Sequence, residues 1–380
     1  MEAESRADLL DLLRSGGPPL EPLPTREILI YGAGNCGRSL GEAAIKAGFS
    51  VLGFLDASAA SIPEVDGIRC SLPESPAGRW AAAAGVPVVL GIFNFATDLR
   101  PVRELLRGIG FSRIISLYEF NEHLDRAPQF WLTKRRFYRD NKGEILAGFD
   151  LLKDAVSRRI FCQHIALRLT FDLDLLASPD QESQYVPADL PFPAGPLRLI
   201  DGGAYTGDTL DSFLRKGIEF EAVVAFEPDL ENFHRLGDLV AKRPVDFGEI
   251  SLWPCGLADH TGIQKFATGH GAGSSLRAAI TDWLISEPNH TQVVALDDVM
   301  PTFAPSLIKL DIEGAEPAAL LGAQRLITRV QPTLAVCVYH EPDHLWTIPL
   351  LIHRLWPEYR IALRYHQFNG FDVVAYAFRE

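Results

Sequence analysis

Two glycine-rich stretches follow apolar runs and have the residue types to bind nucleotides. The first is IYGAGNCGRSL, in which Gly32, Gly34 and Gly37 have GxGxxG spacing. The second is LIDGGAYTGDTL, in which an acid, Asp201, precedes the glycines. Both patterns predict a strand, a tight turn and the N-terminus of a helix, where backbone N–H groups bind anions. Two such loops in one chain suggest two different ligands.

The first loop has the features of a dinucleotide site. Asp56 ends the next predicted strand about 20 residues on, where an acid can bind ribose hydroxyls. The segment from IYGAGNCGRSL through VLGFLDAS resembles the small Rossmann-like domain of some bacterial sugar acyltransferases. That resemblance implies a nucleotide sugar bound at Gly32, Gly34, Gly37 and Asp56. NAD, a nucleotide sugar and no ligand at all stay open as interpretations.

The second loop suits another ligand. Asp201 would repel a pyrophosphate, but it can face the cationic methionine end of S-adenosylmethionine, directly or through water. The N–H groups of the glycine turn can bind the carboxylate of that ligand. In AFEPDLENF, Glu227 ends the next strand, where a carboxylate can accept both ribose hydroxyls. The residues therefore predict an S-adenosylmethionine site.

S-adenosylmethionine donates a methyl group, and an acceptor hydroxyl would need a base beside that group. LIKLDIEGAEPAAL places Asp311 and Glu313 directly after a buried strand, and His340 follows the next strand. These three are the candidate catalytic residues, although Asp311 could instead orient the acceptor or contact the cofactor amine. Glu316 is interpreted as charge in the first turn of a helix. Lys309 could reach a substrate carboxylate or phosphate if the turn brings it round.

No metal site is expected. His340 and His344 are four residues apart, but Pro342 lies between them and disfavours a regular helix. The five cysteines are neither paired as CxxC nor spaced with a histidine as zinc ligands are, and they are expected to be reduced and mostly buried. The polar loop 269–275 is a candidate cover for the cofactor or the acceptor.

Six motifs, in order, resemble the FkbM-type family of S-adenosylmethionine-dependent methyltransferases: LIDGGAYTGDTL, AFEPDLENF, WPCGLADHTG, GAGSSL, VVALDDV and LIKLDIEGAE. The resemblance covers about residues 190–380. It implies methyl transfer to an oxygen, often a hydroxyl of a sugar or a secondary metabolite, and it places residues 255–259 near the adenine. The cofactor-binding candidates are then Asp201, Gly202, Gly203, Ala204, Gly207, Glu227, Gly256 and Leu257.

Two other functions compete with methyl transfer. An NAD-dependent oxidoreductase would use the first glycine loop, but no Tyr-x-x-x-Lys pattern follows it within the predicted domain at 25–120. A non-catalytic nucleotide-binding protein would have lost activity at both loops, and the intact Asp201 and Glu227 speak against that.

The same resemblance implies a small-molecule or sugar substrate, and the composition argues against other partners. The net charge of -13 argues against a nucleic-acid partner, which needs a basic surface. The apolar run 81–96 is too short and too interrupted to span a bilayer. MEAESRADLL lacks the pattern of a signal peptide, so a cytoplasmic location is expected.

Strand and helix signals alternate in two parts of the chain, as in parallel sheets. The expected fold is α/β, with two Rossmann-like parallel-sheet domains joined by a helical connector. The second is expected to be a class I methyltransferase fold with an antiparallel terminal hairpin turning at Asn369-Gly370. The predicted parts are an N-terminal helix and loop at 1–24, a nucleotide-binding-type domain at 25–120, the connector at 121–190 and the methyltransferase domain at 191–380.

Overall fold

The computed structural model describes residues 5–125, 131–266 and 289–379. The chain divides into two compact units. Unit 1 comprises Met1–Phe149, Arg158–Pro179 and Tyr365–Asp372, and unit 2 comprises Asp150–Ser157, Asp180–Arg364 and Val373–Glu380. The predicted cover loop, 269–275, lies outside the described residues.

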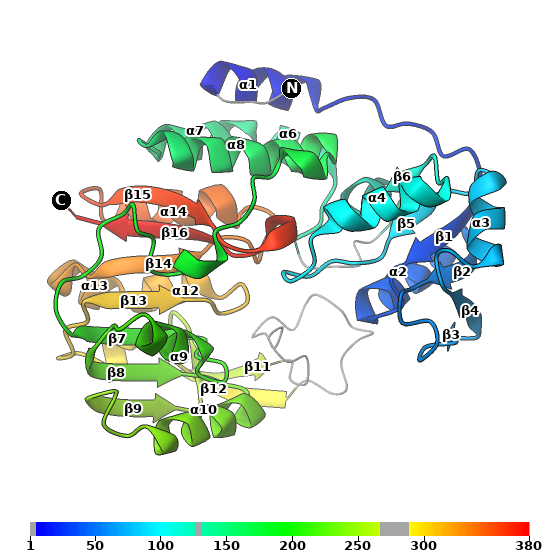
Figure 1. The fold of residues 1–380 in the computed structure, drawn as a ribbon. Helices are drawn as coiled ribbons and strands as arrows, with labels where there is room; N and C mark the ends of the chain where they lie inside the picture. The colour runs from blue at the N-terminus through cyan, green and yellow to red at the C-terminus, as the bar shows by residue number, and fades with distance from the viewer. Residues whose placement is uncertain (1–4, 126–130, 267–288, 380) are drawn as a thin grey trace. The chain divides into compact units, whose positions relative to one another are not determined.

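Unit 1 is built on a six-stranded sheet in the order β3-β4-β2-β1-β5-β6 (Figure 1). The central strand β1 is parallel to β2 and β5, and β3 is antiparallel to β4. The strands are β1 (Glu27–Tyr31), β2 (Ser50–Leu55), β3 (Glu64–Val65), β4 (Ile68–Ser71), β5 (Val88–Leu90) and β6 (Ile114–Ile115).

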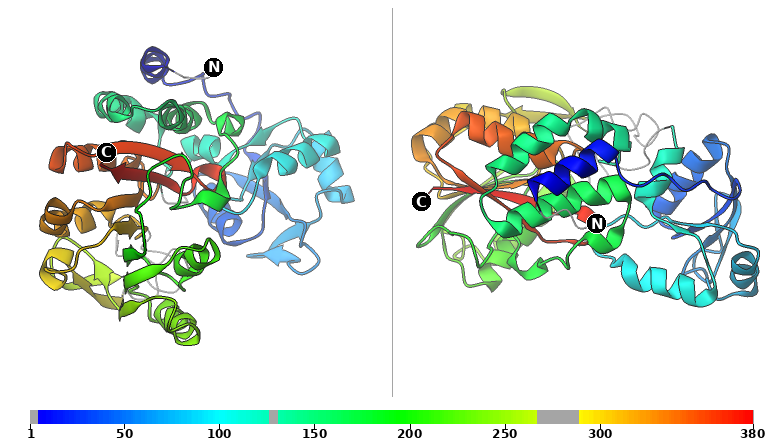
Figure 2. Two further views of the ribbon diagram at one scale, coloured as in Figure 1. Left: turned by 60° about the vertical axis from the view of Figure 1, so that its left-hand side comes forward. Right: turned by 90° about the horizontal axis from the view of Figure 1, so that it is seen from above.

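Helices cover both faces of this sheet because β1 is apolar on both sides (Figures 1 and 2). Leu29 and Tyr31 pack in one cluster with Ala81 and Leu106, on the face of α3 and α4. Ile30 points the other way, towards Gly41 of α2. This alternation is the period of two that a strand imposes. The helices are α1 (Arg6–Ser15), α2 (Asn35–Lys46), α3 (Pro76–Ala83), α4 (Leu99–Ile109), α5 (Leu117–Phe120) and α6 (Arg135–Asp140).

Residues 365–372, far along the chain, belong to unit 1. The side-chain amide of Asn369 donates to the carbonyl oxygens of Asn94 and Thr97, both at 2.8 Å. The Phe371 ring lies 4.5 Å from the Trp131 ring, centroid to centroid. Unit 1 is therefore completed by a segment that separates the last two strands of the chain. Helices α7 (Lys142–Leu151) and α8 (Ala155–Thr170) each have residues in both units.

Unit 2 contains a seven-stranded sheet in the order β15-β16-β14-β13-β7-β8-β9. Neighbouring strands from β14 to β9 are parallel, and β16 is antiparallel to β14. All four residues of β13 are buried, as expected for a central parallel strand. The strands are β7 (Leu197–Gly202), β8 (Phe220–Phe226), β9 (Glu249–Trp253), β13 (Leu307–Leu310), β14 (Thr333–Cys337), β15 (Arg360–Tyr365) and β16 (Val373–Phe378). The expected α/β fold with its antiparallel terminal strands is confirmed.

Helices also cover both faces of this sheet, with α9 and α10 on one face and α12 and α14 on the other (Figures 1 and 2). A small sheet in the order β10-β12-β11 adjoins α12 through β10. The helices are α9 (Asp208–Arg215), α10 (Leu230–Lys242), α11 (Leu296–Val299), α12 (Glu316–Gly322), α13 (Gln324–Val330) and α14 (His344–Leu355), and the small strands are β10 (Gly256–Leu257), β11 (Gly262–Phe266) and β12 (Asn289–Val294).

The connection between β15 and β16 is longer than the two-residue hairpin turn that Asn369-Gly370 suggests. Both residues have positive φ, 60° and 85°, as that dipeptide favours. The strands, however, end at Tyr365 and resume at Val373. The dipeptide thus marks a turn correctly, but inside a longer segment that is part of unit 1.

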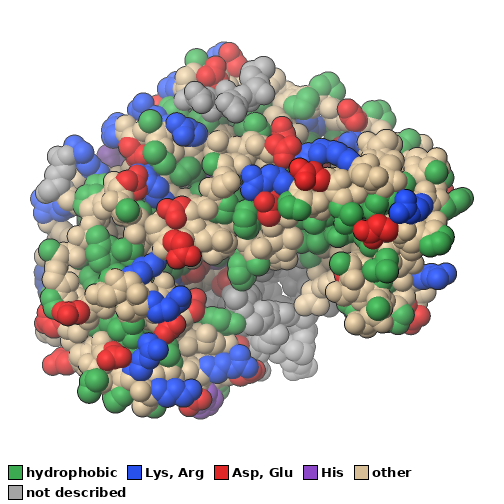
Figure 3. All heavy atoms as spheres, in the orientation of Figure 1, with side chains coloured by type: hydrophobic (Ala, Val, Ile, Leu, Met, Phe, Trp, Pro, Cys, Tyr) green, Lys and Arg blue, Asp and Glu red, His purple; other side chains and the backbone are tan. Residues whose placement is uncertain are grey.

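Two features of the described residues concern possible partners. No helix among them is long and apolar enough to cross a membrane. On the face drawn in Figure 3, acidic and basic side chains lie interspersed.

The five cysteines are free thiols, and four of them are buried.

Candidate functional site

Three of the predicted acids lie at the carboxyl ends of neighbouring strands. Asp201 is in β7, Glu227 follows β8 and Asp311 follows β13. β7 lies between β13 and β8 and is parallel to both. The chain passes from β7 to β8 on one side and later returns to β13 on the other. This reversal is the topological switch point at which open α/β sheets bind ligands.

Asp201 is fully buried and forms an ion pair with Lys309, its direct partner across β7 and β13. The Lys309 Nζ atom lies 3.0 Å from Asp201 Oδ1 and donates to the Gly203 carbonyl oxygen at 2.6 Å. Burial opposes the charge on Lys309, but the carboxylates of Asp201 and Asp311 raise its pKa above its usual value. The ammonium group is therefore bound inside the protein, and the prediction that it reaches a substrate is wrong.

The turn after β7 is glycine-rich because other backbone comes close to it. Gly203 has a φ of 75°, and a Cβ there would lie 1.9 Å from the Asp311 carbonyl oxygen. A Cβ on Gly202 would lie 2.8 Å from Leu257 Cδ1. The turn is thus fitted between the end of β13 and β10, which holds Gly256 and Leu257. Ala204 is fully buried, and Gly207, with a φ of 90°, is the N-cap of α9.

Glu227 anchors the same turn from the side of β8. Its Oε2 atom accepts a hydrogen bond from the Tyr205 N–H at 2.8 Å, and its Oε1 atom accepts one from the Asp229 N–H at 2.9 Å. Burial raises the pKa of Glu227 to about 6, against the effect of these two donors. A carboxylate has about four acceptor positions, so Glu227 can also accept hydroxyl donors.

His340 lies among three carboxylates. Its Nδ1 atom is 2.8 Å from Glu316 Oε1, and its Nε2 atom is 3.4 Å from Asp311 Oδ1 and 3.8 Å from Glu313 Oε2. Burial disfavours the charged ring, but the carboxylates of Glu316 and Glu313 outweigh burial and raise the pKa of His340. His340 therefore holds a proton at neutral pH, and it is a hydrogen-bond donor in this arrangement.

Glu316 has a more specific role than first-turn helix charge. It is fully buried, and its Oε1 atom also accepts the Ile312 N–H at 2.9 Å. Burial alone would raise the pKa of Glu316, but the rings of His340 and His344 and the Ile312 N–H lower it. The carboxylate therefore stays ionised and binds the segment after β14 to the start of α12.

Asp311 and Glu313 are the partly accessible acids of the group, with 25% and 19% of their side chains exposed. Asp311 Oδ2 accepts a hydrogen bond from the Tyr185 hydroxyl at 2.8 Å, and Oδ1 accepts a longer one from Tyr339 at 3.5 Å. Sequence reasoning missed Tyr185, which lies outside every recognised motif and precedes β7. Asp311 and Glu313 therefore keep contact with solvent, unlike the fully buried Asp201 and Glu316.

The comparison with protein families concerns this same part of the chain. Residues 201–371 match the family model of the methyltransferase FkbM domain. The match starts at Asp201 and includes Glu227, Asp311, Glu313 and His340. It supports a methyltransferase.

The fold has a solved relative. A crystal structure of methyltransferase FkbM from Methylobacillus flagellatus KT is similar to this chain, with a TM-score of 0.79. The identity is 19%, and the match covers 98% of this chain and 100% of the other. At this identity the likeness shows the fold, and its extent includes both units. No curated protein matches the chain. The resemblance of the first unit to sugar acyltransferases stays a prediction.

No group of three or more His, Cys, Asp or Glu side chains is placed to hold a metal ion within residues 5–125, 131–266 and 289–379. Two carboxylates of unit 2 are bound by cationic side chains. Asp201 is paired with Lys309, and Glu316 with His340.

The first glycine loop has the predicted geometry in unit 1. A Cβ on Gly37 would lie 1.9 Å from the Gly32 carbonyl oxygen, so helix α2 and the turn pack closely. A Cβ on Gly34, by contrast, would have no described atom within 4 Å. Asp56 accepts the Ala33 N–H at 2.8 Å through Oδ2. The four predicted residues therefore lie together, and the carboxylate of Asp56 holds the loop in place.

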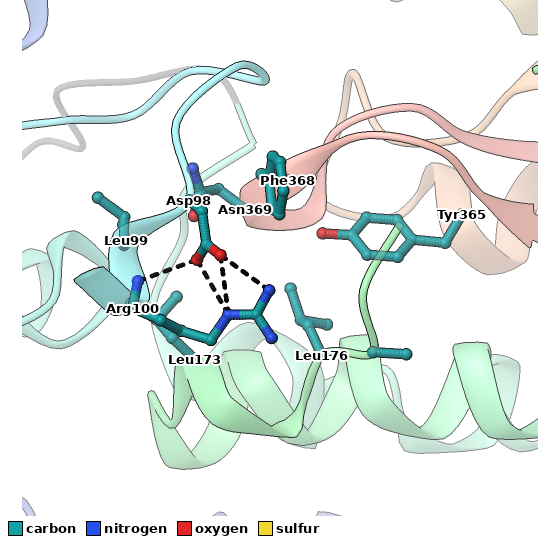
Figure 4. Close-up of a pocket in the computed structure, with 9 residues that line it drawn as sticks. Asp98, Leu99, Arg100, Leu173, Leu176, Tyr365, Phe368 and Asn369 are labelled. Carbon is teal, nitrogen blue, oxygen red and sulfur yellow. Dashed lines mark hydrogen bonds and ion pairs between the residues drawn. The ribbon is translucent and has the colours of Figure 1, made fainter. Parts of the chain in front are cut away.

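A pocket of unit 1 lies apart from the predicted residues (Figure 4). Its volume is about 20 Å³, which is room for roughly one water molecule and not for a nucleotide. The guanidinium of Arg100 holds the Asp98 carboxylate there, at 2.8 Å between Nη2 and Oδ2, and lowers the pKa of Asp98. Asp98 and Arg100 of this pocket thus already bind one another.

Proposed function

We propose that unit 2 is an S-adenosylmethionine-dependent O-methyltransferase that acts on a hydroxyl of a sugar, a glycan precursor or a secondary metabolite. The observation that carries this proposal is the placement of Asp201, Glu227 and Asp311 at the switch point of the sheet. These acids lie in the region that matches the methyltransferase FkbM domain. The cofactor, when bound, supplies a methyl group already activated on a sulfonium.

The residues at the ends of β7 and β8 fit this cofactor. Glu227 keeps acceptor positions for the two ribose hydroxyls, because each of its oxygens accepts one backbone N–H and has a second lone pair. The N–H groups of the turn from Gly203 to Gly207 are the candidates for the methionine carboxylate. Asp201 is buried against Lys309, so it would act on the ligand by fixing the turn.

Asp311 is the residue to which we assign the proton of the acceptor hydroxyl. It is partly accessible, and His340 Nε2 lies 3.4 Å from its Oδ1 atom. His340 already holds a proton, so we assign it to orient Asp311 and Glu313. Glu313 would then hold the acceptor. Two carboxylates at the mouth of the site favour acceptors that carry no negative charge near the reacting hydroxyl.

Calorimetric titration with S-adenosylmethionine, with and without EDTA, tests the cofactor assignment. We expect one-to-one binding that EDTA does not change, and at least a tenfold weaker binding for Glu227→Gln. Glu231→Gln is the matched control, because Glu231 is exposed and pairs with Arg235 on α10. Wild-type protein that fails to bind, or equal affinity in both variants, would overturn the assignment.

Methyl transfer itself is tested by the release of S-adenosylhomocysteine in the presence of a panel of free sugars, nucleotide sugars and hydroxylated metabolites. Asp311→Asn should lower turnover with any active acceptor by about 10²–10⁴-fold while cofactor binding stays. Retained turnover in Asp311→Asn would assign the base elsewhere.

For unit 1 we propose a nucleotide or nucleotide sugar at the first glycine loop. The supporting observation is that a Cβ on Gly34 would meet no described atom within 4 Å, so packing does not require glycine there. At Gly37, by contrast, packing does require it. Titrations of the variants with a UDP-sugar and with NADH test this proposal. Gly34→Leu places a side chain at the loop, and Gly108→Leu is the control, because a Cβ on Gly108 would also have no atom within 4 Å. Binding of the UDP-sugar that only Gly34→Leu abolishes would support the proposal. Binding of NADH would favour the oxidoreductase. If neither the UDP-sugar nor NADH binds, unit 1 is a unit without a nucleotide ligand.

A further inference from the structure

Tyr185 is held in the site from both ends, although it lies outside the region that matches the FkbM domain. Its side chain is buried and its hydroxyl donates to Asp311 Oδ2 at 2.8 Å. Its backbone N–H donates to the hydroxyl of Tyr376, in β16, at 2.9 Å. Its φ is 62°, which is rare for a bulky residue and persists only where the surroundings determine it.

We propose that Tyr185 is a positioning residue for methyl transfer, which fixes the Asp311 carboxylate so that Oδ1 is the oxygen that takes the proton of the acceptor. The inference rests on the proposed function, because it assigns a task to Asp311 in that reaction. The two oxygens of this carboxylate are unequal. Oδ2 accepts the short Tyr185 bond, whereas the nearest donors to Oδ1, on His340 and Tyr339, lie at 3.4 and 3.5 Å.

A hydrogen bond from a phenol favours the ionised form of a carboxylate and restrains its rotation. Cys337 lies behind Tyr185, with Sγ 3.6 Å from the hydroxyl oxygen. Since the Tyr185 proton is directed at Asp311, the thiol can donate to the tyrosine oxygen. Lys309 lies 5.5 Å from the centre of the Tyr185 ring. Tyr185 is thus fixed by neighbours on β13, β14 and β16.

Other charged groups lie near Asp311. Lys309 and Asp208 interact with it electrostatically, and His340 Nε2 lies 3.4 Å from its Oδ1 atom. These groups are the same in wild-type protein and in a Tyr185→Phe variant. A change on removal of the phenol oxygen therefore reports on the contacts of that oxygen, of which the bond to Asp311 is the shorter.

The test is a titration of Asp311 by ¹³C NMR in protein labelled at the aspartate carboxyl carbon, with Asp311→Asn identifying the signal. Tyr185→Phe should move the midpoint of the Asp311 titration upward by about one pH unit, since a hydrogen bond to a charged group is worth that much. Tyr339→Phe is the matched control, because its bond to the same carboxylate is longer, and it should move the midpoint by much less. Equal shifts, or no shift in Tyr185→Phe, would overturn the positioning role.

S-adenosylmethionine titrations of the same proteins separate this inference from the proposed function. Tyr185→Phe should bind the cofactor as wild type does, because Tyr185 contacts none of the groups assigned to it. If wild type fails to bind, the proposed function falls and the role of Tyr185 falls with it. If wild type binds and the two phenylalanine variants titrate alike, only the inference about Tyr185 fails.

Discussion

The Nδ1 atom of His340 lies 2.8 Å from Oε1 of Glu316, and both side chains are buried. This pair joins the segment after β14 to the first turn of α12, next to the accessible Asp311. Each partner stabilises the charged form of the other, so the pKa of His340 is raised and that of Glu316 is lowered. The site thus contains a buried cation whose charge depends on one carboxylate above all.

Replacing Glu316 with glutamine should destabilise the protein by about 3–5 kcal/mol, because a buried imidazolium loses its partner. Urea unfolding at pH 7 measures the change in the free energy of unfolding. Glu313→Gln is the control, since Glu313 is 3.8 Å from the ring and partly exposed, and it should cost about 1 kcal/mol or less. Equal losses of unfolding free energy in the two variants would show that the short contact between Glu316 and His340 stabilises the protein no more than the longer one of Glu313.

The same pair predicts how stability depends on pH. The His340 contribution is complete below its unfolded-state pKa of 6.5 and is lost as pH rises through the raised folded-state pKa. The Glu316 contribution is present above 4.5 and is lost as pH falls through the lowered folded-state pKa. Between pH 7 and 10 the free energy of unfolding of wild type should therefore fall, and that of His340→Gln should fall less. Parallel curves in a denaturant series would contradict the raised pKa.

The strands at the site could be predicted because central parallel strands are continuous apolar runs between turns. β1 (Glu27–Tyr31) and β13 (Leu307–Leu310) are such runs. Strands β3 and β4 are too short for a periodic pattern, and they form through contacts with neighbours that local propensity does not contain. Helix α3 (Pro76–Ala83) does carry local signals, with Ser75 as N-cap, a proline in its first turn and several alanines.

The partners of the site residues were harder to predict than the residues themselves. Asp201 and Glu227 end apolar runs, so their position at one edge follows from a parallel sheet. The pairing of Lys309 with Asp201 depends on the register of β13 against β7, which the sequence does not show. Tyr185 precedes β7 in a segment without periodicity, and only the folded chain brings it to Asp311.

Crowding at the glycine turn gives a further prediction. Gly203→Ala should destabilise unit 2 and weaken S-adenosylmethionine binding, because the new Cβ would lie 1.9 Å from the Asp311 carbonyl oxygen. Gly217→Ala is a matched control, since Gly217 has the same φ of 75° but no atom within 4 Å of its Cβ. The control should cost only the backbone strain, about 1 kcal/mol. Equal effects in unfolding and in calorimetry would mean that φ alone requires glycine at the turn.

The last prediction concerns Asn369, which anchors residues 365–372 in unit 1. Its side-chain amide donates to the carbonyl oxygens of Asn94 and Thr97. Its backbone carbonyl oxygen accepts a hydrogen bond from the Tyr118 hydroxyl at 3.0 Å. Asn369→Gly keeps the positive φ but removes the two side-chain bonds, so it should cost about 1–3 kcal/mol. Asn369→Ala removes the same bonds and adds left-handed strain, about 1 kcal/mol more.

Hydrogen exchange distinguishes the two contributions where global unfolding cannot. Both Asn369 variants should speed exchange of the Phe371 N–H, which donates to the Phe368 carbonyl oxygen within the anchored segment. The alanine variant should speed it more, because strain acts on the backbone of the segment itself. A wild-type exchange rate in Asn369→Gly would show that the two hydrogen bonds of the Asn369 side-chain amide do not stabilise the segment. Equal exchange in both variants would show that the left-handed backbone costs nothing at this turn. Wild-type exchange in both would leave the Tyr118 bond to the Asn369 backbone and the packing of Phe371 on Trp131 as the contacts that keep the segment in unit 1.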